Sequence, residues 1–147
     1  MKRATLALFV ASALAAAGCA QMSDMMGGGS KGMTEQVSLS GSNEVPPVTS
    51  PASGSGTVTV NADRTVTARI TVVGMTPTAA HIHQGAPGSN GPVIVPFVKQ
   101  GESTFVAADG AKMTEEQYTA YKAGNTYVNV HSAKSPGGEV RAQLKGR

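Results

Sequence analysis

The sequence is poor in residues on which several classes of protein depend. Its 147 residues include one Cys and no Trp, and 4% are aromatic. A single Cys excludes an intramolecular disulfide framework and any metal site built from several thiolates. Charged residues make up 14% of the chain and no run of Lys or Arg occurs, so the pI near 9.2 does not indicate a nucleic-acid-binding surface. We expect no nucleic-acid partner.

Long hydrophobic runs are equally scarce. The one that stands out, Ala4–Ala17, is too short to span a bilayer permanently. It follows Lys2 and Arg3 and leads into small residues, which is typical of a secretory signal. The sequence therefore predicts a signal peptide over residues 1–18. Its removal takes away Lys2 and Arg3 and lowers the formal charge from +3 to +1.

The signal ends in a segment that resembles the bacterial lipobox, Ala16-Ala17-Gly18-Cys19, with Ala16 where Leu is preferred. The resemblance implies that Cys19 is diacylated on its sulfur and becomes the first residue after cleavage. Ala20 rather than Asp follows, which implies sorting to the outer membrane. The predicted location is extracytoplasmic and lipid-anchored, at the periplasmic face of the outer membrane in a Gram-negative source. The alternative is an ordinary signal peptide that leaves Cys19 as a free thiol.

The segment after the signal, residues 19–34, is rich in Gly, Ser and Met without periodicity and is interpreted as a flexible tether. Thioethers are soft ligands that suit Cu(I), so these methionines either gather copper or are incidental to a low-complexity linker. They are Met22, Met25, Met26 and Met33.

Residues 35–147 alternate apolar and polar side chains in short runs separated by turns, which predicts one all-β barrel or sandwich. One short helix is expected over residues 114–122, where Thr114 and Gln117 form a capping box and Gly124 ends the helix. The expected strands cover residues 37–39, 57–60, 65–72, 79–84, 93–98, 104–107, 126–131 and 139–144.

The three histidines of the chain share a predicted orientation. On a strand, His81 and His83 point to one face and Ile82 to the other. The alternation of the last two strands places His131 and Arg141 on the faces opposite their apolar neighbours. A pair of imidazoles at positions i and i+2 can chelate one ion, and a third imidazole completes a three-ligand site that suits copper or zinc.

Two other residues share the face of His131. Tyr127 and Asn129 either line the predicted site or pack against neighbouring strands.

Five segments of the chain are specific enough to compare with known families. They are GSNEVPPV at 41–48, AHIHQG at 80–85, GPV at 91–93, YVNVHS at 127–132 and PGGEVRAQL at 136–144. Together they resemble the CHRD (chordin-type) domain over about residues 37–145. Many members of that family are extracellular modules without an assigned activity, so the resemblance by itself implies little chemistry.

The order His-x-His, Val-x-Val-His and Gly-Gly-x-x-Arg is also similar to Cu/Zn superoxide dismutase, a Greek-key β-barrel that holds copper on its outer wall. The similarity implies that His81, His83 and His131 bind copper and that Arg141 guides superoxide to the ion. No His lies between His83 and His131, so the bridging imidazole and the zinc site are missing. The resemblance is therefore to a copper-only form, with zinc the less favoured metal.

One carboxylate and one cation have competing interpretations. Glu44 either orients a ligand histidine through its second ring nitrogen or is a surface carboxylate in a Pro-rich turn. Arg141 either guides the substrate or is a solvated strand residue paired with Glu139 or another acid.

The sequence thus predicts a lipid-anchored, copper-dependent superoxide dismutase. The alternative is a non-enzymatic CHRD module that binds or delivers copper or binds a protein partner. A zinc hydrolase is less favoured, since no carboxylate is clearly placed as general base beside the His pair.

Overall fold

The computed structural model describes residues 32–146. The predicted signal peptide, Cys19 and all of the tether up to residue 31 lie outside the described residues. Within the described part, no helix has the length and apolar character that crossing a membrane requires.

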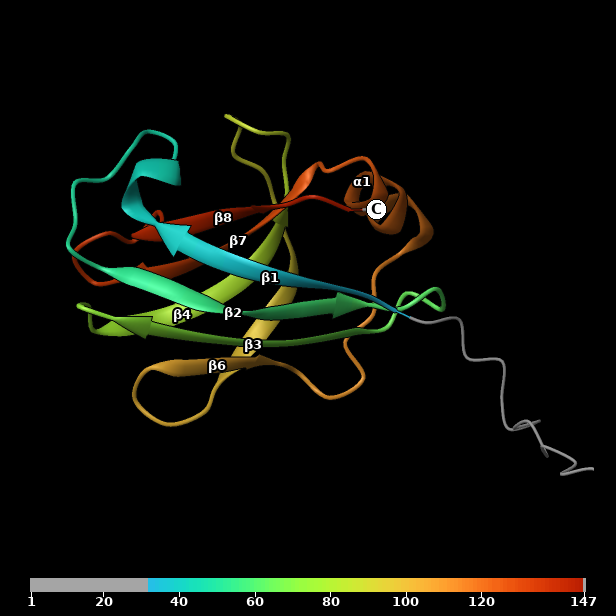
Figure 1. Cartoon of the computed structure of the whole chain (residues 1–147), viewed down its shortest axis with the longest axis horizontal. Helices are drawn as coiled ribbons and strands as arrows, with labels where there is room; N and C mark the ends of the chain where they lie inside the picture. Colours follow the sequence, from blue (N-terminus) through green and yellow to red (C-terminus); the bar gives the residue numbers. More distant parts are fainter. Residues whose placement is uncertain (1–31, 147) are drawn as a thin grey trace, which may run out of the picture.

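Eight antiparallel strands close into a barrel in the order β1-β2-β3-β6-β5-β4-β7-β8 (Figure 1). The β3–β4 and β6–β7 connections join strands that are not neighbours in this order, which gives the expected Greek-key arrangement and confirms the predicted all-β class. β1 begins at Met33, so the last two residues assigned to the tether belong to the barrel. The elements are β1 (Met33–Ser40), the 3-10 turn η1 (Gly41–Asn43), β2 (Ser53–Val60), β3 (Val66–Val73), β4 (Pro77–Gln84), β5 (Val93–Lys99), β6 (Thr104–Ala107), α1 (Glu115–Lys122), β7 (Thr126–Ser132) and β8 (Val140–Leu144).

The barrel interior is filled by the apolar members of each alternating strand. In β3, Val66, Ile70 and Val72 are buried, and the alternate residues Thr67, Arg69 and Thr71 are exposed. Ile82 of β4 and Val128 of β7 are fully buried in the same core. The period-2 pattern therefore fixes which side chains face inward, and it places every second residue on the outer wall.

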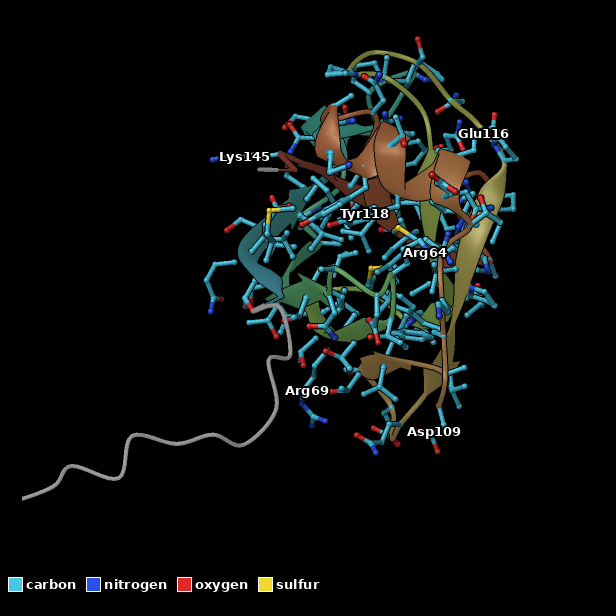
Figure 2. The ribbon with its side chains drawn as sticks, turned by 90° about the vertical axis from the view of Figure 1, so that its right-hand side faces the viewer. Arg64, Arg69, Asp109, Glu116, Tyr118 and Lys145 are labelled. Carbon is cyan, nitrogen blue, oxygen red and sulfur yellow. The ribbon has the colours of Figure 1, made fainter. Side chains whose placement is uncertain are left out.

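The helix α1 lies across one end of the barrel, and Figure 2 views the molecule from that end. The predicted capping box is present, because Thr114 Oγ1 accepts from the Gln117 backbone N–H and the Gln117 side chain accepts from the Thr114 backbone. Tyr121 is fully buried, and Tyr118, labelled in Figure 2, packs against the core from the helix. The helix closes this end of the core.

Candidate metal centre

The outward side chains of β4, β7 and β8 form a polar group on the barrel wall, which we call the outer layer. Strand register aligns its members in rows that run across the strands. His131 of β7 lies opposite Ala79 of β4, whereas Asn129 and Tyr127 of β7 each lie between one residue of β4 and one residue of β8. The rows are Ala79–His131, His81–Asn129–Arg141 and His83–Tyr127–Gln143. All three histidines and Arg141 are therefore on the outside of the barrel, as the alternation predicts.

The outer layer is nevertheless shielded from solvent by the loop of residues 85–92. Arg141 donates from Nη2 to Ser89 O at 2.8 Å and from Nη1 to Asn90 Oδ1 at 3.1 Å, and Gln143 Nε2 donates to Gly85 O at 3.0 Å. Arg141 is only 1% exposed. The interpretation of Arg141 as a solvated residue paired with Glu139 is therefore wrong: the loop covers its guanidinium and supplies its acceptors.

The three histidines converge on one point of the outer layer. One nitrogen from each of His81, His83 and His131 lies within 4.8 Å of the other two. His81 Nδ1 is 3.1 Å from His131 Nε2, and the ring centroid of His83 lies 5.5 Å from that of His81. β4 and β7 are paired over their whole lengths, so adjacent strands hold all three rings.

Backbone carbonyls fix the orientation of two of these rings. His83 Nδ1 donates to Gly91 O at 2.9 Å, and His131 Nδ1 donates to Pro136 O at 3.0 Å. Each Nδ1 must carry the proton, which leaves a lone pair on each Nε2. Gly91 can reach His83 only as glycine, because a Cβ there would lie 1.6 Å from the carbonyl oxygen of Gln84.

The residues present fit a bound cation. His83 Nε2 is buried and has no hydrogen-bond partner, although it carries a lone pair aimed into the group of imidazoles. Burial, followed by the proximity of His131 and His83, lowers the pKa of His81 to about 4, and burial also lowers the pKa of His83. Metal ligation requires neutral imidazole, and these two rings are neutral at pH 7.

Glu44 is close to the outer layer, but it lies beside Asn129 and Arg141 rather than beside a histidine that it could orient. The second nitrogens of His83 and His131 are bound to carbonyl groups, so Glu44 does not orient either ring. It is 5% exposed and lies beside Asn129 and Arg141. Burial raises its pKa to about 7, against the opposing effects of Arg141, Asn129 and the Val45 backbone. Glu44 is thus a buried carboxyl, which excludes its interpretation as a surface carboxylate.

Arg141 is connected to the histidines through an aromatic ring. Its guanidinium carbon lies 3.4 Å from the centroid of Tyr127, and His83 stacks on Tyr127 with centroids 4.8 Å apart. A cavity of about 230 Å³ beside Arg141 is bounded by Asn43, Pro87, Gly88 and Gln143. The structure therefore gives Arg141 an evident role in anchoring the loop, and its role in guiding superoxide stays a prediction.

Sequence reasoning missed the features that complete the site. Nothing in the residue types at Gly91 and Pro136 indicates that their carbonyls bind imidazole, since any residue has a carbonyl. Asn129 and Tyr127 were placed on the correct face by strand alternation, and the structure buries both within the outer layer.

Fold and site together define a closed Greek-key barrel with a three-histidine group on its outer wall that could hold a metal ion. The CHRD domain family matches residues 36–144, and the chain belongs to that family. Neither a curated protein nor a solved structure matches the chain.

Proposed function

We propose that this CHRD-domain protein binds copper through His81, His83 and His131 and acts as a copper-dependent superoxide dismutase. The observation that carries the proposal is the convergence of three imidazole nitrogens within 4.8 Å, one of them buried without a partner. A predicted signal and lipid attachment at Cys19 support placing this activity outside the cytoplasm, on a membrane-anchored chain.

Copper is favoured over the other divalent metals by the donor set. Imidazole nitrogen suits copper and zinc, and among divalent first-row metals Cu(II) binds a given nitrogen site most tightly. Imidazole also tolerates Cu(I), as a redox cycle requires. Three protein ligands leave coordination positions open for a small substrate, and the half-buried rings of His81 and His131 keep the ion within reach of solvent.

A bound copper ion would supply one-electron transfer, which converts two superoxide anions and two protons to oxygen and hydrogen peroxide. The chain must hold the ion and admit a small anion. Binding requires the proton between His81 Nδ1 and His131 Nε2 to leave, and its transfer to His81 Nε2 frees both lone pairs. The charge of Arg141, close to the imidazoles through Tyr127, raises the local concentration of an anionic substrate.

A second candidate function is copper binding or delivery without turnover. The burial of Arg141 favours it, because a guanidinium that is 1% exposed and bound to Ser89, Asn90 and Gln143 presents little of its charge to solvent. A protein that only holds the ion needs no such charge at its surface.

Metal titration and activity measurement on the purified, chelator-stripped protein separate these functions. The first proposal requires one tightly bound copper per chain with superoxide turnover, both lost in His81→Ala. Thr78→Ala, an exposed position on the same strand, is the matched control and should change neither. Copper binding without turnover would favour the second candidate, and the absence of stoichiometric copper or zinc would refute both.

A further inference from the structure

We infer that Asn129 is a fourth protein ligand of the metal centre, donating its side-chain oxygen Oδ1 to the ion held by the three histidines. The inference rests on the proposed copper site and goes beyond it, because it assigns an oxygen donor to a group otherwise made of imidazoles.

Asn129 occupies the centre of the outer layer. It lies directly opposite His81 in the β4–β7 register and shares the outward face of β7 with His131. On its other side it lies opposite Arg141 of β8. The side chain is 1% exposed, so its amide must find partners within the outer layer or remain unsatisfied.

The neighbours of the amide determine which end faces the histidines. Asn129 Nδ2 is directed at Gly137 O, 3.5 Å away, and a Cβ added at Gly138 would lie 2.5 Å from both Asn129 Nδ2 and Glu44 Oε1. The NH₂ group therefore lies among acceptors, namely a carbonyl and a carboxyl. The reverse orientation would place Oδ1 against those acceptors and is disfavoured.

With that orientation, Asn129 Oδ1 is left toward the imidazoles without a hydrogen-bond partner. The register places His81 of the neighbouring strand directly opposite Asn129, and His83 follows two residues along the same outward face. His83 Nε2 is the other unpartnered atom. In neutral His83 both atoms are acceptors, so neither can satisfy the other.

Two buried acceptors without partners have lost their hydrogen bonds to water with nothing in exchange, which is unfavourable. A cation between them satisfies both at once, since lone pairs on nitrogen and oxygen are what a metal ion accepts. A neutral amide oxygen is a harder donor than imidazole, so we expect Asn129 to favour Cu(II) over Cu(I).

The direct test is electron–nuclear double resonance on the Cu(II)-loaded protein labelled with ¹³C at the asparagine side-chain carbonyl. Ligation predicts a strong ¹³C coupling that is absent in Asn129→Leu, together with a shifted Cu(II) EPR spectrum and about tenfold weaker Cu(II) binding. Thr126→Val is the matched control, because Thr126 is also fully buried on β7 with an unpartnered oxygen but faces the opposite side. It should leave spectrum and affinity unchanged.

If Asn129→Leu does not fold, the ¹³C coupling in the Cu(II)-loaded wild-type protein tests the inference by itself. One copper per chain without ¹³C coupling, or with equal spectra for wild type and Asn129→Leu, would overturn this inference while the three-histidine site stands. A bridging water between Asn129 and the ion would give that result. A wild-type protein that binds no copper would overturn both the inference and the proposed function.

Discussion

Replacing Glu44 with Gln removes a buried carboxyl whose pKa is raised from 4.5 to about 7 by burial. Between these two pH values the folded protein holds a proton that the unfolded chain has released. The free energy of unfolding of the wild type therefore falls as pH rises through this window and levels off above pH 7. Gln does not titrate, so the Glu44→Gln protein lacks this contribution at every pH.

The magnitude follows from the displacement of the pKa. A shift from 4.5 to about 7 corresponds to roughly 3.4 kcal/mol at 1.36 kcal/mol per unit. Water and nearby dipoles relax around the ionised carboxylate, which reduces the expected effect to about 2 kcal/mol.

Urea denaturation of the metal-free wild type and Glu44→Gln at pH 4.5, 6 and 8 measures this difference. Both proteins keep the same histidines, so their difference in unfolding free energy isolates Glu44. We expect wild type to lose about 2 kcal/mol relative to Glu44→Gln between pH 4.5 and 8. Any constant effect of the substitution cancels. Parallel stability curves would refute the burial argument for Glu44.

Three further predictions concern stability and the separation of the loop anchor from the metal site. Gly138→Ala should lower the free energy of unfolding, measured by urea denaturation, by at least about 2 kcal/mol, because Gly138 has φ +127 and a Cβ would lie 2.5 Å from two side-chain atoms. Gly137→Ala is the control. A Cβ there would have nothing within 4 Å, so the loss should be under about 0.5 kcal/mol. Equal losses would contradict this account. Arg141→Met should destabilise the protein by about 3 kcal/mol, because Ser89 O and Asn90 Oδ1 lose their charged donor. Metal analysis of this variant should still find one copper per chain. Loss of copper would show that the loop anchor and the metal site are not separable. Thr114→Ala should cost about 1 kcal/mol by removing the capping box, and unchanged thermal unfolding would show that α1 needs no cap.

Local patterns in the sequence were sufficient to predict the eight strands in outline, the capped helix and the outward direction of the histidines and Arg141, although β1 and β2 begin four residues earlier than expected. The alternation His81-Ile82-His83 determines two faces wherever the strand lies, and the buried Ile82 confirms the assignment. The proximity of His131 to that pair depends on β4 and β7 being neighbours, which is a long-range pairing. The similarity to Cu/Zn superoxide dismutase, rather than periodicity, indicated that His131 lies near the other two histidines.

Burial of the outer layer could not be predicted from the same patterns. Alternation separates inside from outside of a sheet, but it does not show that a loop covers the outside. The contacts of Arg141 with Ser89 and Asn90 join segments about fifty residues apart, and one of them uses a backbone carbonyl. For the same reason, the residue types at Gly91 and Pro136 do not indicate that their carbonyl groups accept from His83 and His131.

The barrel closes at a narrow join between β1 and β8, where Ser40 and Arg141 are the one registered pair. Farther along, the Glu35 carboxylate accepts from the backbone N–H groups of Lys145 and Gly146 at 2.7 and 3.2 Å. Amide hydrogen exchange should therefore be fastest along this join, where few backbone bonds must break for local opening. Such opening admits water beside Arg141, while the seven registered pairs of β4 and β7 keep the histidines together. The barrel can therefore open locally beside Arg141 while the three histidines stay close together.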